Sequence, residues 1–339
     1  VVLLLIGISA VVLTVGLAFL VASFAARNSD LWVHLAAGRM ITTGEYRPGG
    51  ADPLSFTAAD RTWVNHSWLF DLGAYLLYSP DGVALVAVKA VAFAAAFALL
   101  FAIRRPGHSL WPWAAVGVAA MLAASPRMVL GPLVGSVFFF ALTLFLIFRV
   151  PNPPGSWRLP TLVGVTFWLW AGTDAWFFVG PLALALLLVG ELVRTKGLNA
   201  DGPATPADDP LGALPDLGTL AKTLAVGVVA CCLTPHHVRV WEVPFELTGG
   251  PGVEDPRLAG LVLSPMTPEF WRNPSFGYNL NGAALIALYA AGVYAVALTA
   301  LIGRALGRPF DVEPLPLPHA LLWCGVAALA AKSAPLPRP

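Results

Sequence analysis

Asp30 and His34 are the two side chains of the sequence with the best spacing for joint acid–base chemistry. They lie four positions apart in the segment Asn28–Arg39, and residues at this spacing share one face of a helix. Asp30 would fall in the first turn, where the positive end of the helix dipole favours its ionised form. Such a pair could position an acceptor hydroxyl for general-base attack or hold a metal ion. The alternative is a solvated helix at the membrane interface, with Trp32 as an anchor.

Asp174 and Arg127 are charged residues within otherwise apolar sequence. An ionisable group at membrane depth costs roughly 2.5–3.5 kcal/mol on insertion, so it normally faces a cavity or a partner. We therefore expect Asp174 either to line a polar cavity or to mark a helix break, paired with an arginine. Arg127, which follows Pro126, suits bidentate hydrogen bonds to a lipid phosphate. It could equally be a loop-end charge whose side chain extends to the interface.

Two further candidates lie in the second long polar segment, residues 235–276. His236 and His237 are expected at the membrane interface. Adjacent histidines cannot share a helix face, so a metal site there is disfavoured. Glu269 lies two positions before Trp271 in an aromatic-rich stretch, which suits either stacking on a carbohydrate or anchoring at the membrane surface.

Three short motifs carry a resemblance to a family of membrane enzymes. They read Asp30-x-Trp32-x-His34, Asp52-Pro53-x-Ser55-x-Thr57 and Trp63-x-Asn65-His66-x-Trp68-Leu69. An acidic residue after the first apolar span, a helix ending at glycine and an aromatic entry into the next helix resemble the first outer loop of GT-C-type glycosyltransferases. That group includes the dolichyl-phosphate-mannose protein mannosyltransferases and the lipid A aminoarabinose transferase. The motifs look still more like those of uncharacterised bacterial multi-spanning relatives, and residues 170–177, 234–237 and 264–271 extend the resemblance more loosely.

The resemblance implies an enzyme that moves a sugar from a polyprenyl-phosphate donor to an unknown acceptor at the outer face of the membrane. Asp30 would be the catalytic base, with His34 beside it. A wider set of residues would bind the substrates: Trp63, His66, Arg127, Asp174, His236 and Glu269. Arg127 or His66 would hold the phosphate, because phosphate departure needs local positive charge.

No cofactor is expected. In enzymes of this type a second acidic residue often follows the catalytic one, and this sequence has Leu31 there. That difference disfavours a divalent metal at Asp30 and favours a metal-independent base. No Walker, Rossmann, HExxH or GxSxG pattern is present, so we expect no nucleotide use. The alternative function is a non-catalytic membrane scaffold or a transporter with a degenerate fold of this type, although transporters usually show related halves.

Composition indicates a membrane protein. Of the 339 residues, 58% are hydrophobic and 12% are charged, and the mean hydropathy is +0.75. Soluble domains carry roughly 25% charged residues. The formal net charge of +1 argues against a nucleic-acid partner. The three cysteines lie in apolar stretches without the spacing of a zinc site or a disulfide framework.

The long apolar runs are predicted to cross the bilayer as helices, because lipid cannot hydrogen-bond an exposed backbone. The predicted fold class is all-α, a polytopic transmembrane bundle of about 9–11 helices that forms one domain over residues 1–339. The expected helical runs are Val1–Ala26, Ser67–Tyr78, Val83–Ile103, Leu110–Ala124, Met128–Phe148, Thr161–Val193 with a break near Gly172–Asp174, Leu217–Thr234, Leu280–Ile302 and Leu317–Ala331.

Three polar segments separate these runs: a first outer loop at residues 27–66, a linker at residues 194–216 and a second loop at residues 235–276. Within the first loop we expect a helix that Ser29 caps and that stops at Gly44.

The orientation follows from basic residues in short loops, which mark the cytoplasmic side. Four basic pairs have few acidic neighbours: Arg104/Arg105, Arg149/Arg158, Arg194/Lys196 and Arg304/Arg308. With these inside, both large loops lie outside a bacterial cytoplasmic (inner) membrane, and Ser67–Tyr78 is a juxtamembrane or re-entrant helix. If that segment crosses the membrane instead, the later assignments invert relative to the first loop; we favour the first arrangement because it gathers the unusual polar residues on one face. Because the chain begins without Met and ends in Pro335–Pro339, we expect it to be a piece of a longer protein.

Overall fold

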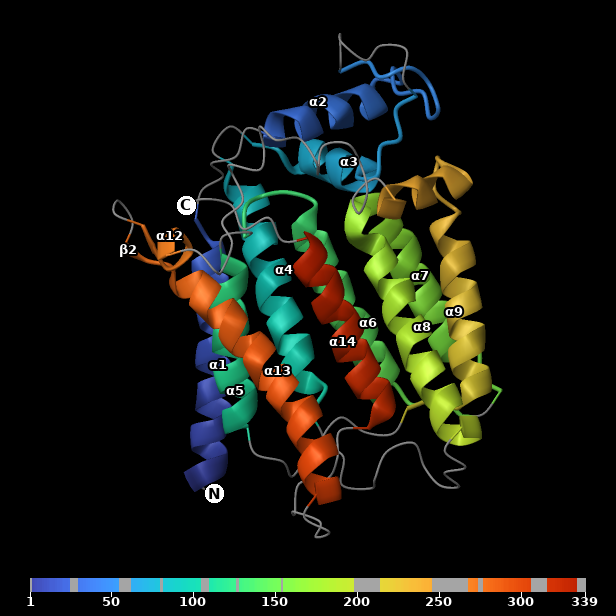
Figure 1. Cartoon of the computed structure of the whole chain (residues 1–339). Helices are drawn as coiled ribbons and strands as arrows, with labels where there is room; N and C mark the ends of the chain where they lie inside the picture. The colour runs from blue at the N-terminus through green and yellow to red at the C-terminus, as the bar shows by residue number, and fades with distance from the viewer. Residues whose placement is uncertain are drawn as a thin grey trace.

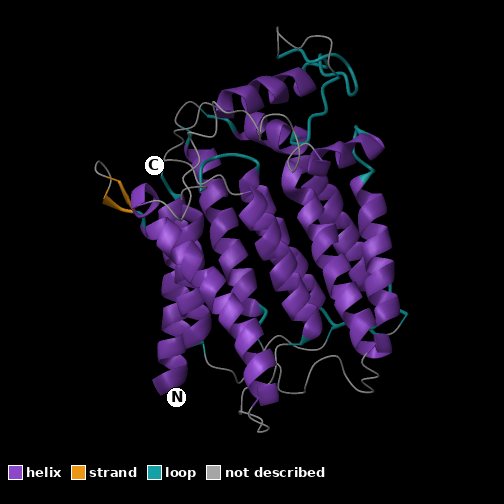
Figure 2. Cartoon of the chain, in the orientation of Figure 1, coloured by secondary structure: helices purple, strands orange, loops and turns teal. Residues whose placement is uncertain are grey.

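The structure is a computed structural model that describes residues 2–24, 30–54, 62–79, 82–104, 110–125, 128–153, 155–197, 214–245, 268–273, 277–305 and 316–333. Helices dominate this part of the chain (Figure 2). Its only strands are β1 (Arg272–Asn273) and β2 (Gly277–Tyr278), which pair antiparallel. The predicted all-α class is therefore confirmed at the level of secondary structure.

The long helices stand side by side as a bundle, and two shorter helices lie across one end of it (Figure 1). The crossing pair is α2 (Asp30–Thr42) and α3 (Trp68–Leu77). The bundle contains α1 (Val2–Ala22), α4 (Val83–Ala102), α5 (Trp111–Ala124), α6 (Leu133–Arg149), α7 (Arg158–Thr173), α8 (Val179–Leu192), α9 (Leu217–Cys231), α13 (Leu280–Ala305) and α14 (Leu317–Ser333). The short α12 (Pro268–Trp271) precedes β1.

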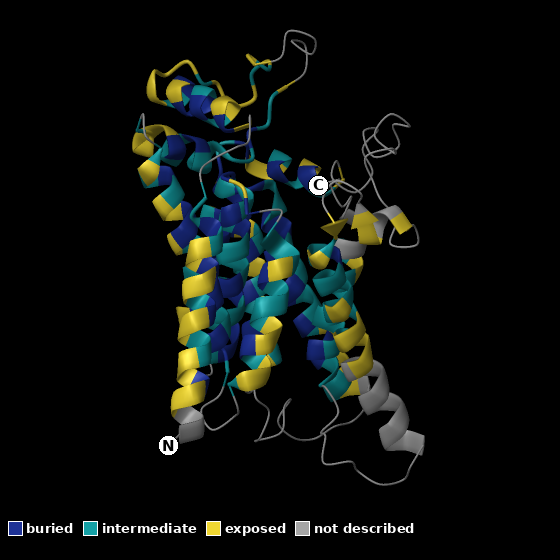
Figure 3. Cartoon of the chain, turned by 90° about the vertical axis from the view of Figure 1, so that its left-hand side faces the viewer, coloured by how far each residue is buried: buried dark blue, intermediate teal, exposed yellow. Residues whose placement is uncertain are grey.

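Three described helical segments are long and apolar enough to cross a membrane: Leu5–Ala22 in α1, Val83–Ala102 and Ala175–Lys196. Further apolar helices of 10–17 residues stand beside them. The outer face of α1 exposes large apolar side chains, with Leu13 73% and Leu20 68% exposed, and appears as a column of exposed residues in Figure 3. Such a surface is unfavourable in water and suits lipid.

The apolar run Thr161–Val193 is broken at Asp174, as predicted. Helix α7 ends at Thr173, Asp174 has an extended backbone, and a 3-10 turn, η2 (Ala175–Phe178), leads into α8. Because α3 packs on α7, the break lies at the end of the bundle that carries α2 and α3.

Helix boundaries agree with the sequence prediction to within a few residues at most places. The helix expected in the first loop is α2, and Gly44 follows its end with φ of +76°, a left-handed conformation that glycine adopts without strain. Its expected cap, Ser29, lies outside the described residues, as does most of the linker at residues 194–216. Helix α6 begins at Leu133 rather than Met128, because Pro132 stands at its start and lacks an N–H to continue a helix backwards.

Candidate functional site

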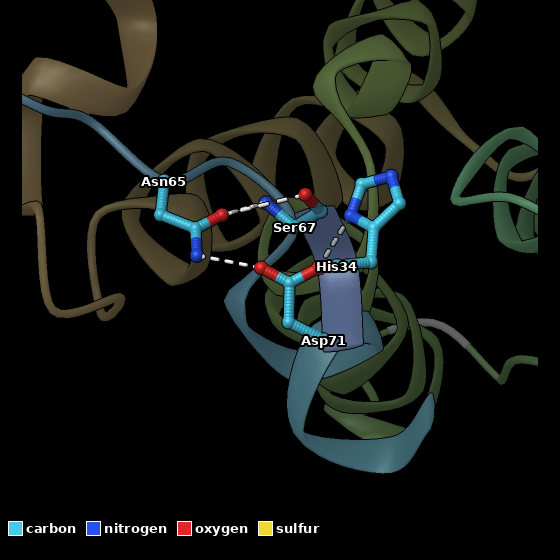
Figure 4. A network of polar contacts seen from close by, with 4 residues as sticks. All are labelled: His34, Asn65, Ser67 and Asp71. Carbon is cyan, nitrogen blue, oxygen red and sulfur yellow. Dashed lines mark hydrogen bonds and ion pairs between the residues drawn. The ribbon is translucent and has the colours of Figure 1, made fainter. Parts of the chain in front are cut away.

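The centre of the candidate site is a hydrogen bond between two helices that cross the end of the bundle. His34 of α2 and Asp71 of α3 meet with 2.6 Å between His34 Nδ1 and Asp71 Oδ1 (Figure 4). Asp71 is 1% exposed, whereas the side chain of His34 is 18% exposed. The His34 ring also packs edge-on against Phe70. A buried carboxylate therefore holds one nitrogen of a partly exposed imidazole.

Close packing of α2 against α3 makes this bond. At Gly38, an added Cβ atom would lie 2.2 Å from the carbonyl oxygen of Asp71 and 2.6 Å from the Cβ of Tyr75. The two helices thus approach to backbone contact, which only glycine permits. Gly38 lies one turn beyond His34 on the same face of α2, so its close approach also brings His34 to Asp71.

Asn65 holds the second oxygen of Asp71. Its Nδ2 donates to Asp71 Oδ2 at 2.7 Å, and its Oδ1 accepts the backbone N–H of Ser67 at 3.0 Å and the Ser67 hydroxyl at 3.3 Å (Figure 4). Asn65 is 4% exposed. Both carboxylate oxygens of Asp71 are therefore engaged, and the carboxylate is fixed in orientation as well as position.

This arrangement can perform general-base chemistry. A carboxylate accepts hydrogen bonds, so the bond to Asp71 keeps a proton on Nδ1 of His34. The other ring nitrogen, Nε2, is then left as the acceptor in the neutral ring. A base that a third group orients in this way is the arrangement that activates hydroxyl nucleophiles in many enzymes.

A cavity of about 440 Å³ adjoins the pair, and its walls include His34, Asp71, Trp63, His66 and Asp174. Asp52 also lines it, whereas no lysine or arginine is among the described residues of its wall. The acidic and aromatic wall suits a ligand rich in hydroxyl groups, which can donate to carboxylates and pack against an aromatic ring.

A buried network of hydrogen bonds holds Asp174 at the cavity wall. Ser136 of α6 donates a short hydrogen bond to Asp174 Oδ2, and Trp170 Nε1 donates to the Ser136 hydroxyl at 2.6 Å. Asp174 is 6% exposed. Of the two interpretations of this residue, the structure favours the cavity wall together with the helix break. Its donors there are the Ser136 hydroxyl and the backbone N–H groups of Ala175 and Trp176.

His66 lines the same cavity as a neutral ring. Burial, reinforced by repulsion from His236 and opposed by Glu242, lowers the pKa of His66 from 6.5 to about 4. At neutral pH it therefore carries no positive charge. The prediction that His66 holds the phosphate then rests on the one hydrogen bond that the neutral ring can donate, rather than on a positive charge.

Asp30 does not belong to the cavity wall. It begins α2 as an exposed residue, and the predicted partnership of Asp30 with His34 is replaced by that of His34 with Asp71. The spacing of four places both residues on neighbouring turns, but His34 turns toward α3. A base at Asp30 would therefore lie on the exposed surface and outside the described cavity lining.

The remaining predicted residues are placed as follows. Trp63 lines the cavity, and the Tyr46 ring packs edge-on against the Trp63 ring. His236 is buried and bonds to the chain at Asn65. Glu269 lies in α12, with its side chain outside the described residues, and Arg127 lies outside them altogether. The structure thus brings His34, Trp63, His66 and Asp174 to one cavity, with His236 behind it.

Sequence reasoning missed Asp71 and the role of Asn65. A signal was present, because Asp71 is the only charged residue between Arg61 and Asp81 and lies in an apolar helix. An isolated carboxylate in such a helix needs a partner.

No metal centre is formed by the described residues, in which no three His, Cys, Asp or Glu side chains gather to hold an ion. Comparison of the chain with protein-family models, curated proteins and solved structures finds no match. The geometry of the site is therefore the basis for a functional proposal.

Proposed function

We propose that this chain is a membrane glycosyltransferase in which His34, oriented by Asp71, deprotonates the hydroxyl of an acceptor. The observation that carries the proposal is the 2.6 Å contact between His34 Nδ1 and Asp71 Oδ1 at the wall of a cavity. The sugar donor is a polyprenyl-phosphate-linked sugar, on the strength of the resemblance of the first loop to GT-C-type enzymes.

The reaction balances without a cofactor. The acceptor O–H proton moves to His34 Nε2, and the acceptor oxygen forms a bond to the anomeric carbon of the sugar. The bond between that carbon and the phosphate oxygen breaks, and polyprenyl phosphate leaves with the electron pair. Asp71 stabilises the imidazolium that forms, as a buried carboxylate beside a histidine does in hydrolases.

We assign the cavity to the acceptor rather than to the phosphate, and the charge of its described wall supports this. Among the described residues of the wall, the ionisable ones are Asp52, Asp71, Asp174, His34 and His66, and His66 is neutral at neutral pH. A phosphate would be repelled by such a wall. The donor phosphate would therefore lie outside it, where Arg127 remains the candidate from sequence.

The membrane setting fits a lipid-linked donor. Apolar helices form the bundle, and the site lies at the end of the bundle where α2 and α3 cross (Figure 1). We place the protein as a multi-pass protein of the bacterial inner membrane with this end outside, because the basic residues Arg149, Arg194 and Lys196 belong to the opposite end of α6 and α8.

The second candidate is a non-catalytic scaffold. It is favoured by the complete pairing of Asp71 and the burial of Asn65, which would fasten α2 and α3 to each other without any chemistry.

An assay of donor cleavage separates the two. Purified protein in nanodiscs is given a pool of labelled polyprenyl-phosphate sugars and an envelope extract as acceptor, and release of polyprenyl phosphate is measured. The enzyme reading predicts release by the wild type and by the control His237→Asn, an exposed position, and loss with His34→Gln. Equal release by wild type and His34→Gln would support the scaffold.

A further inference from the structure

His236 joins the second polar segment to the candidate site. It follows α9, is 5% exposed, and accepts two hydrogen bonds at Nε2. The backbone N–H of Asn65 donates at 3.1 Å, and the hydroxyl of Tyr46 lies 2.5 Å away. Tyr46 also packs edge-on against the His236 ring. His236 Nε2 thus contacts Asn65 and Tyr46, which lie 171 and 190 positions from it in the sequence.

The protonation of His236 follows from these contacts. A backbone N–H can only donate, so Nε2 of His236 carries no proton. Burial, reinforced by the nearby Arg239 and His237, lowers the pKa of His236, and the ring is neutral with its proton on Nδ1. Burial and the charge of Asp71 raise the pKa of Tyr46 above its ordinary value, so its hydroxyl remains protonated and donates to His236.

Asn65 links His236 to Asp71 through hydrogen bonds. His236 fixes its backbone, and Ser67 fixes its side-chain oxygen through a backbone N–H and a hydroxyl. The amide cannot be turned over, because its Nδ2 would then face the N–H of Ser67. Nδ2 must therefore point to Asp71 Oδ2, which leaves Oδ1 for His34.

We infer that Tyr46 and His236 are positioning residues that act through Asn65 and Asp71 to hold the proton of His34 on Nδ1. Neither has to touch a substrate. The chain of contacts runs from Tyr46 to His236, then through Asn65 and Asp71 to His34. Its effect on catalysis rests on the proposed function, whereas its effect on the His34 tautomer does not.

The functional consequence concerns the second polar segment. The sequence predicts His236 in substrate binding, and in the structure its Nε2 accepts a hydrogen bond from the backbone of Asn65, a residue of the cavity wall. His236, in the turn after α9, thereby joins a hydrogen-bond network whose other members, Tyr46, Asn65, Asp71 and His34, come from the first loop, α2 and α3.

The NMR signals of the histidine ring nitrogens show directly which nitrogen carries the proton. Protein labelled with ¹⁵N-histidine is reconstituted in nanodiscs, and the His34 signals are assigned by their loss in His34→Gln. The wild type is expected to show His34 and His236 each as the Nδ1–H tautomer. His236→Leu removes the acceptor and is expected to turn the His34 signal into a mixture of both tautomers.

Three further variants sharpen the test. His236→Gln supplies a side-chain oxygen as acceptor and should restore the single His34 tautomer. Tyr46→Phe keeps the aromatic packing, loses the hydroxyl and should give a partial mixture. The control His237→Asn should resemble the wild type.

An unchanged His34 tautomer in both His236→Leu and Tyr46→Phe would overturn the inference; if His236→Leu does not fold, Tyr46→Phe alone decides it. A tautomer shift in protein that has no transferase activity even as wild type would leave the inference standing and remove the proposed function.

Discussion

His34 and Asp71 lie 37 positions apart in the sequence, and their side chains meet at 2.6 Å. His34 belongs to α2, in the first polar loop, and Asp71 belongs to the apolar helix α3, so the pair forms only when the two helices pack together. Their contact depends on the backbone approach of α2 and α3 at Gly38.

Gly38→Ala should therefore separate the two helices. A methyl group there would lie 2.2 Å from the carbonyl oxygen of Asp71, and relief of such an overlap typically costs about 1–3 kcal/mol. We expect a lower thermal unfolding temperature in detergent and loss of the Nδ1–H signal of His34. Gly73→Ala, in α3 with no atom within 4 Å of the added Cβ, is the matched control and should be neutral or slightly stabilising. Equal stability of the two variants would refute the close approach.

His66 should make stability depend on pH. The folded protein keeps this ring neutral down to about pH 4, whereas the unfolded chain protonates it near 6.5. Between these values the unfolded state binds more protons, so the free energy of unfolding falls as pH drops from 6.5 toward 4, by up to about 3 kcal/mol. His66→Gln lacks this titration and should lose less stability over the same range. Thermal unfolding at pH 7.5 and pH 4.5 gives the comparison, and parallel losses in wild type and variant would show that His66 is not buried as a neutral group.

The sequence was sufficient for the helices and insufficient for the centre of the site. The break at Asp174 and the stop at Gly44 have local causes, namely a polar residue in an apolar run and a glycine after a helix. The contact of His34 with Asp71 has no local cause in the sequence. The spacing of Asp30 and His34 concerns one helix, whereas the contact with Asp71 depends on how α2 and α3 cross. Asn65 and His236 were visible only as members of motifs, since their hydrogen bonds join segments 171 positions apart.

The two ends of the bundle should lie on opposite sides of the membrane. Glu45 is exposed just beyond α2, and Lys196 lies in the turn after α8 at the other end. On a background without Cys231, Cys232 and Cys324, an impermeant maleimide should label Glu45→Cys in intact cells. Lys196→Cys should be labelled only after the membrane is opened. Labelling of both positions in intact cells would contradict the proposed orientation.

The central claim is that His34 and Asp71 act as one catalytic unit, and a double-mutant comparison of transfer rates tests it most directly. Loss of a general base typically lowers the rate by about 10²–10⁴-fold, and residues that act together give losses that do not multiply. We predict a large loss in His34→Gln, a loss in Asp71→Asn, and a double variant no slower than His34→Gln alone, at matched folding. Asp30→Asn, at an exposed position outside the cavity, should retain most activity. Full transfer by His34→Gln, or losses that multiply in the double variant, would contradict the account.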